Sequence, residues 1–227
     1  MVKDPWAGIG AMFVRDRMTT RPLTVPPETS VMDALELMRR NKVRRLPVMA
    51  GDSLVGIVTE LDLLHVSPSP ATSLSVFEIN YLVSKMRVKD AMTTDVITVS
   101  PDDTVEKAAM TMRENKIGGL PVMEGKKLVG IITETNIFDA FLEMLGVTKV
   151  GVRITVDVPD RKGVLADLTD AIRDADANII SLATFGLAPG RARIVLRLEP
   201  QNADAAADAI SARGFELVHK TKSYVQF

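Results

Sequence analysis

Residues 46–60, LPVMAGDSLVGIVTE, recur 74 positions later at residues 120–134 as LPVMEGKKLVGIITE. When the 227-residue chain is shifted by this distance, the match extends without a gap from residues 14–64 onto residues 88–138, and 25 of 51 pairs are identical. Both copies open with Met-Thr-Thr. A repeat of this length predicts that two copies of one structural unit occupy roughly the first 145 residues.

Each copy predicts the element order β-α-β-β-α. Ser30 and Thr104 stand where they can cap a helix, and apolar residues follow each of them at helical spacing. A tight turn containing Gly51 or Gly125 joins two β-rich segments, and a second helix begins near Thr59 or Thr133. The predicted strands are 23–25, 46–49 and 54–59 in the first copy, and 97–99, 120–123 and 128–133 in the second.

The segments outside the repeat set the predicted boundaries. Residues 65–72 are rich in Ser and Pro and predict a linker, whereas residues 75–86 are amphipathic and predict a helix. Residues 1–11 lack periodicity and predict an extension, for which disorder is one interpretation; Met12 is an alternative start. The predicted division is an extension at 1–11, a first unit with linker at 12–72, a second unit with leading helix at 73–146, and a C-terminal domain at 147–227.

The C-terminal domain has a different pattern from the repeats. Its predicted elements follow the order β-α-β-β-α-β, which is typical of a ferredoxin-like sheet covered by two helices. The overall fold class is therefore α+β. The predicted strands are 152–158, 178–185, 193–198 and 215–219, and the predicted helices are 163–173 and 202–212.

The composition excludes several classes of protein. With 28 Lys and Arg against 29 Asp and Glu, the chain has no global attraction to nucleic acid. It has no cysteine, and it contains no apolar run of the roughly 18 residues that a membrane helix requires. These features predict a cytoplasmic protein with no nucleic-acid or membrane partner.

Catalysis has little support in the sequence. His65 and His219 fall in different predicted domains, and no hydrolase, zinc-protease or Walker motif occurs. The methionines fall mostly at helical core positions, as Met38 and Met112 do, which favours packing over ligation. We therefore predict that the protein is not an enzyme and has no metal or other cofactor.

Thr59 and Asp62 allow two interpretations. A hydroxyl and free N–H groups at a helix start suit phosphate oxygens, and a carboxylate one turn later accepts from ribose hydroxyls. The alternative is an N-cap without a ligand. Thr133 and Asn136 repeat the arrangement with a neutral amide, which accepts such bonds less strongly.

Residues 39–45, RRNKVRR, form the densest basic cluster. A solvated helix end explains such a run, because cations suit a helix C-terminus. Alternatively, Arg44 or Arg45 meets a phosphate. The second copy has Gly118-Gly119 at these positions and Asn136 in place of Asp62, so the first copy is expected to bind phosphorylated ligands more tightly. DNA binding is disfavoured, because no recognition helix accompanies the cluster.

The repeated Met-Thr opening, Leu-Pro-Val strand and Gly-Ile-(Val/Ile)-Thr ending resemble a tandem pair of CBS domains, a Bateman module. The resemblance covers Val14 to about Leu145. It favours the nucleotide interpretation of Thr59 and Asp62, and it implies AMP, ATP or S-adenosylmethionine as the class of ligand. The implied contact residues are Thr20, Leu23, Val43, Arg44, Arg45, Pro47, Thr59, Asp62, Thr94, Ile97, Ile117, Pro121, Thr133 and Asn136.

The C-terminal domain resembles an ACT domain. The motif Asp160-Arg161-Lys162-Gly163-Val164-Leu165 carries this resemblance, with lysine where the family usually has proline. The alternatives for this domain are that it binds an amino-acid effector or that it only joins subunits. The implied effector contacts are Asp160, Gly163, Val164, Leu165, Asn178 and Ile179.

The order CBS-CBS-ACT is similar to the acetoin-utilisation protein B family, which is associated with acetoin catabolism in bacteria. The resemblance implies a regulatory, homodimeric sensor of an adenosine-containing ligand, linked to acetoin or central carbon metabolism and acting on a partner enzyme. The alternative is a scaffold that regulates a partner enzyme by protein contact alone, with no ligand bound.

Overall fold

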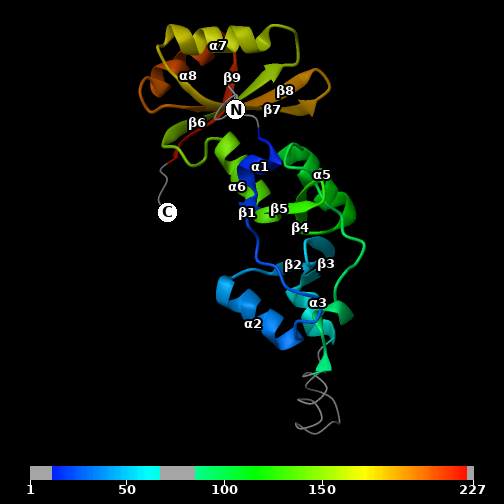
Figure 1. Ribbon diagram of the computed structural model, residues 1–227. Coiled ribbons are helices and arrows are strands. Elements are labelled where there is room, and N and C mark those ends of the chain that lie inside the picture. The colour runs from blue at the N-terminus through cyan, green and yellow to red at the C-terminus, as the bar shows by residue number, and fades with distance from the viewer. Residues whose placement is uncertain (1–11, 67–84, 224–227) are drawn as a thin grey trace, which may run out of the picture. The chain divides into compact units, whose positions relative to one another are not determined.

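The computed structural model of the chain describes residues 12–66 and 85–223 (Figure 1). These residues belong to two compact units, which divide between Ile137 and Phe138. The predicted extension, most of the predicted linker and most of the helix expected at 75–86 lie outside the described residues. Within the described part, no helix is long and apolar enough to cross a membrane.

The first unit contains both repeats, each with the predicted helix, hairpin and second helix, whereas the strands predicted at 23–25 and 97–99 are reduced to single parallel bridges at Val25 and Val99. Its elements are α1 (Val14–Arg17), β1 (Thr19–Thr20), α2 (Val31–Asn41), β2 (Arg45–Ala50), β3 (Ser53–Thr59), α3 (Glu60–Val66), η1 (Val88–Asp90), α5 (Val105–Asn115), β4 (Gly119–Glu124), β5 (Lys127–Thr133) and the start of α6 (Glu134–Met144).

The local signals of the repeat produce the expected structure. Ser30 Oγ accepts the Asp33 N–H at 3.0 Å and begins α2, and Thr104 Oγ1 accepts the Lys107 N–H at 3.2 Å and begins α5. Both predicted N-caps are therefore confirmed. The hairpins β2–β3 and β4–β5 are antiparallel, with equivalent bulges after Val48 and Val122.

The leading segment of each repeat pairs with the other repeat. Thr19 lies opposite Ile131, so β1 of the first copy becomes an edge strand beside β5 of the second. Thr93 of the second copy likewise forms an antiparallel bridge with Ile57 of β3. Further along the same segment, Val25 pairs within its own repeat, where it forms a parallel bridge with Val48 of β2.

We call this pairing of each leading segment with the other repeat the exchange. At both crossings, a methionine of the leading segment packs on a glycine of the other repeat. A Cβ atom on Gly56 would lie 2.5 Å from Met92 Sδ and 3.1 Å from the Thr93 carbonyl oxygen. Gly130 has the equivalent relation to Met18, again with a carbonyl oxygen at 3.1 Å. Because a side chain at either position would overlap the crossing strand, glycine permits the close approach of the two repeats.

Hydrogen bonds extend the exchange beyond the strands. The Val14 N–H donates to the Asp103 carbonyl at 2.8 Å, just as the Val88 N–H donates to Thr29 at 2.9 Å. The bridge between Phe13 and Thr104 belongs to the same contact. The segment that leads into one repeat therefore forms hydrogen bonds with the other repeat, just before the first helix of that other repeat.

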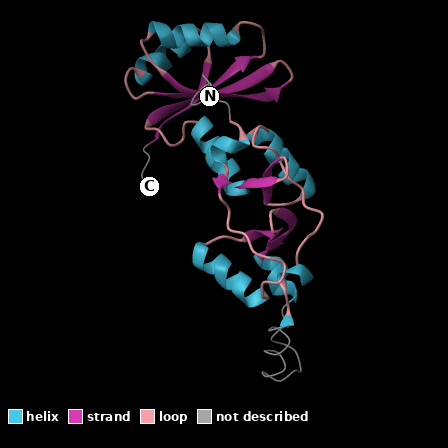
Figure 2. Ribbon diagram, viewed as in Figure 1, coloured by secondary structure: helices cyan, strands magenta, loops and turns pink. Residues whose placement is uncertain are grey.

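The second unit is a four-stranded antiparallel sheet of order β7-β8-β6-β9 with α7 and α8 on one face (Figure 2). This order confirms the predicted ferredoxin-like arrangement. Strand β9 runs further than predicted, because it continues to pair with β6. The elements after α6 are β6 (Gly151–Pro159), α7 (Val164–Asp174), β7 (Ile179–Ala188), β8 (Arg191–Leu198), α8 (Ala203–Ala212) and β9 (Glu216–Ser223).

The core of the second unit lies between the sheet and the helices. Alternate residues of the central strands, such as Ile154 on β6 and Leu196 on β8, are fully buried against Leu168 of α7 and Ile210 of α8. The residues between them lie on the other face of the sheet, which α7 and α8 leave uncovered and which we call the helix-free face.

The exchange predicts that Gly130→Val destabilises the first unit by about 1–3 kcal/mol, because valine overlaps Met18 and the Thr19 carbonyl. Urea unfolding would measure this cost. Gly186→Val is the matched control, since the Cβ position of this strand glycine has no heavy atom within 4 Å. An equal effect of the two substitutions would contradict the exchange.

Candidate functional site

Thr59 and Asp62 form a closed hydrogen-bonded pair at the junction of β3 and α3. Asp62 Oδ2 accepts the Thr59 N–H at 2.8 Å and the Thr59 hydroxyl at 2.7 Å, and the Asp62 N–H donates back to Thr59 Oγ1 at 3.2 Å. Asp62 Oδ1 accepts no hydrogen bond from a described residue. The capping interpretation is thus confirmed, and it uses only one oxygen of the carboxylate.

Thr133 and Asn136 form the same pair in the second repeat, with a different chemical outcome. The Thr133 N–H and hydroxyl both donate to Asn136 Oδ1, at 2.9 and 2.8 Å. A backbone N–H can only donate, so the Asn136 atom that faces it must be the carbonyl oxygen. The side-chain atom of Asn136 outside this pair is therefore the amide Nδ2, which is a donor. The corresponding atom of Asp62, Oδ1, is an acceptor.

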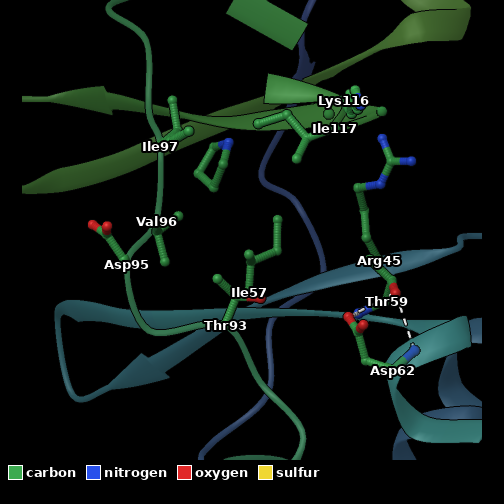
Figure 3. A pocket seen from close by; sticks show the side chains of 13 residues that line it. Arg45, Ile57, Thr59, Asp62, Thr93, Asp95, Val96, Ile97, Lys116 and Ile117 are labelled. Carbon is green, nitrogen blue, oxygen red and sulfur yellow. Dashed lines mark hydrogen bonds between the residues drawn. The ribbon is translucent and has the colours of Figure 1, made fainter. Parts of the chain in front are cut away.

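A cavity of about 330 Å³ lies beside Thr59 and Asp62 (Figure 3). Both repeats line it. The exchanged leading segment of the second repeat forms one wall, because the bridge between Thr93 and Ile57 holds that segment against β3. The lining residues are Arg45, Ile57, Thr59 and Asp62 from the first repeat, and Thr93, Asp95, Val96, Ile97, Lys116, Ile117, Gly118, Gly119 and Pro121 from the second.

Arg45 reaches across the cavity from β2 toward the segment before β4 (Figure 3). Its Cδ lies 3.0 Å from the Cβ position of Gly119, and Nη1 would overlap a side chain there. The two glycines that replace Arg44-Arg45 in the second repeat therefore make room for the arginine of the first. A second arginine at position 119 would compete for the same space.

Arg45 is an incompletely satisfied cation. Its Nη1 is buried and has no hydrogen-bond partner. Burial lowers the pKa of Arg45, the Glu134 carboxylate raises it, and the neighbouring Arg44 lowers it. The guanidinium remains charged, because arginine pKa values start far above neutrality. A buried donor without an acceptor at the wall of a cavity is suited to an anionic group of a ligand.

The structure divides the predicted nucleotide contacts into two sets. Those that line the cavity are Arg45, Thr59, Asp62, Ile97, Ile117 and Pro121. Five others are the counterparts, 74 residues away, of Ile97, Ile117, Pro121, Thr59 and Asp62: Leu23, Val43, Pro47, Thr133 and Asn136. Arg44 does not line the cavity; its counterpart is the lining residue Gly118. Thr94 does not line the cavity, whereas its neighbour Thr93 does; Thr20 is the counterpart of Thr94.

Sequence reasoning missed several lining residues. Thr93, Asp95 and Val96 follow the exchanged Met-Thr sequence, and Lys116 ends α5 with a left-handed φ of 54°. The motif spacing itself contains no sign that these residues face Thr59 of the other repeat. Met-Thr and Gly-Ile occur in both copies, and the exchange explains why both recur, but the sequence alone does not pair them.

The residues predicted for an ACT effector do not meet in one cavity of the described structure. Asn178 and Ile179 line a shallow pocket after α7, and Asn178 Nδ2 donates to Glu199 at 3.0 Å. Asp160 and Leu165 are exposed beside Gly163, which begins α7 with φ 84°, while Val164 is buried in the core.

Comparisons with known proteins agree with this architecture. The CBS domain family matches residues 14–69 and 88–143, and the TTHA0829-like ACT domain family matches residues 150–220. A putative acetoin utilization protein (AcuB) from Vibrio cholerae has a crystal structure that aligns with a TM-score of 0.51 at 30% identity, covering 61% of this chain and 96% of that one.

Curated relatives include proteins of very different length. The uncharacterized protein MJ1426 of Methanocaldococcus jannaschii is 32% identical over 157 residues, which cover 58% of this chain and 92% of that protein. The inosine-5'-monophosphate dehydrogenase of Korarchaeum cryptofilum is 34% identical over 157 residues, which cover 66% of this chain but only 30% of that enzyme.

The packing of Arg45 predicts coupling with Gly119. Gly119→Ala should cost about 1–3 kcal/mol of unfolding free energy in the wild-type protein, because the methyl group overlaps the guanidinium. The same substitution should cost much less in an Arg45→Ala background. A double-mutant cycle by chemical denaturation measures the difference, and equal costs in the two backgrounds would refute the contact.

Proposed function

Because the chain belongs to the CBS-domain proteins and carries an ACT domain behind its CBS pair, we propose that it is a regulatory sensor of adenosine-containing ligands. The ligand occupies the cavity beside Asp62. The observation that carries this proposal is the free Oδ1 of Asp62 in a cavity that also holds an unpaired guanidinium nitrogen of Arg45.

The cavity offers three kinds of contact that a nucleotide needs. Val96 and Ile97 lie at the opposite side from Arg45 and give a base an apolar surface (Figure 3). Asp62 lies in the first turn of α3, and its spare oxygen can accept the ribose hydroxyls. Arg45 and Lys116 supply positive charge for phosphate.

This arrangement favours phosphorylated adenosine over S-adenosylmethionine. A sulfonium group is a cation, and Arg45 and Lys116 would repel it if it occupied the phosphate position. A nucleotide phosphate instead satisfies the buried Arg45 Nη1. We therefore place AMP and ATP first within the proposed class.

Ligand binding would regulate through the two repeats, because both line the cavity. A ligand held by Asp62 on one side and by the 93–97 segment on the other stabilises the exchanged arrangement. This role needs no chemical step, and we expect the protein to modulate a partner enzyme rather than to catalyse. Failure to bind any adenine nucleotide would favour the scaffold alternative.

The metabolic setting and the ACT ligand are further parts of the proposal. Similarity to the Vibrio cholerae protein supports a link to acetoin or central carbon metabolism. That an amino-acid effector binds at residues 160–165 also stays a prediction. Two of its predicted contacts, Asn178 and Ile179, line the shallow pocket after α7.

The two nucleotide positions are predicted to be unequal. Asp62→Asn should weaken AMP and ATP binding by roughly 10- to 100-fold, because the amide oxygen stays in the Thr59 pair and a donor replaces the free acceptor. Titration calorimetry measures the loss, and Asn136→Ala is the comparison at the second position. An equal or larger loss from Asn136→Ala would overturn the assignment.

We also expect a homodimer. Strand β7 is an edge of the sheet and exposes Leu182, Phe185 and Leu187, at 37%, 55% and 45% of their surface. An exposed apolar edge is a common site of pairing between identical chains. Sedimentation equilibrium at micromolar concentration should give twice the 24.7 kDa chain mass, and a monomer would exclude this interface.

A further inference from the structure

Arginines dominate the helix-free face of the ACT sheet. On β8, residues 191, 193 and 197 on this face are all arginine, and Arg153 on β6 lies directly opposite Arg197. In a sheet, side chains directly opposite one another on neighbouring strands are in contact range, and like charges there are destabilising.

Two of the arginines are compensated by carboxylates. Arg193 makes a bidentate ion pair with Asp157, at 2.6 and 2.8 Å, and Arg191 Nη2 donates to Glu216 at 2.8 Å. Asp157 lies directly opposite Arg193 on the neighbouring strand β6, whereas Arg191 reaches Glu216 on β9, the strand beyond β6. The bond to Arg193 lowers the pKa of Asp157, so this pair is fully charged at neutral pH.

The pair formed by Arg153 and Arg197 has no such acid among the described residues. Arg153 Nη1 donates only to the Thr155 hydroxyl, at 3.0 Å. Arg197 is only 6% exposed, and its Nε and Nη1 are buried without a hydrogen-bond partner. Burial, followed by repulsion from Arg153, lowers the pKa of Arg197. Two adjacent cations, one of them buried and unsatisfied, are unstable unless an anion joins them.

Both arginines line a small cavity. Its volume is about 130 Å³, and Arg153 and Arg197 line it together with Leu145, Val147, Phe185 and Val195. Ser181 Oγ also lines it but already donates to the Leu145 carbonyl at 2.8 Å, so the arginines remain its principal free donors. The site therefore combines a double guanidinium fork with an apolar wall.

From this combination we propose that the ACT domain binds a small organic carboxylate between Arg153 and Arg197. The carboxylate oxygens accept from the two guanidinium groups, and a short apolar chain lies against Phe185 and Leu145. The volume equals roughly four water molecules, which admits an acid of a few carbons and excludes a nucleotide. This site is separate from the predicted effector loop at Asp160 and Gly163, and it does not depend on nucleotide binding at Asp62.

Titration calorimetry of the full chain with acetate, propionate and butyrate tests the site, with inorganic phosphate as a second arm. We expect saturable binding of at least one carboxylate, weakened tenfold or more by Arg197→Met and by Arg153→Met. Arg191→Met is the matched control, because Arg191 is paired with Glu216, and it should bind as the wild type does. Asp62→Asn should leave carboxylate binding unchanged, which keeps this test independent of the nucleotide site.

A second measurement covers the unliganded protein. Arg197→Met should raise the urea midpoint of the ligand-free chain, because it removes a buried unpaired charge. Carboxylate binding that Arg197→Met leaves intact would overturn the proposal. So would the absence of carboxylate binding at millimolar concentration, or binding of phosphate alone.

Discussion

The crossing of two short strands is the constraint on which the first unit depends. Thr19 pairs with the hairpin of the second repeat, and Thr93 bridges to the hairpin of the first. Each crossing is possible only because a glycine, Gly130 or Gly56, lets a methionine and a carbonyl lie where a side chain would be. Neither repeat can bury its sheet edge or complete its first helix alone, so the pair forms as one structure.

The same exchange creates the candidate site. Once Thr93 is fixed on β3, the chain that follows must run past Thr59 and Asp62, and it becomes a wall of the cavity. The two positions related by the repeat then differ in their hydrogen-bonding groups, because two pairs of equivalent residues differ between the copies. Gly119 accommodates Arg45, and Asp62 leaves an acceptor where Asn136 leaves a donor. The repeat supplies the framework, and these substitutions are the basis of the selectivity that we propose.

The ACT sheet shows a different use of charge. Its helix-free face compensates Arg191 and Arg193 with carboxylates, and it leaves Arg153 and Arg197 facing a cavity. Unsatisfied buried guanidinium nitrogens occur in both units, at Arg45 and Arg197. Each lies at the wall of a cavity, where a bound anion would offset the cost of burial. The two proposed ligands, a nucleotide and a small acid, would thus each be held by an arginine whose charge the protein leaves unsatisfied.

Local sequence patterns were enough to predict the repeat, the helix caps, the two hairpins and the order of elements in the second unit. These depend on interactions within a few residues, such as Ser30 with Asp33, or on the periodicity of apolar side chains. The sequence also identified Thr59 and Asp62 as a pair, because they are close along the chain. The three-dimensional structure was needed to show which repeat each leading strand joins, because pairing partners about 110 residues apart, such as Thr19 and Ile131, leave no local pattern. For the same reason it alone placed Arg45 against Gly119 and Arg153 opposite Arg197: charge compensation is a property of groups that meet in space, whatever their distance along the chain.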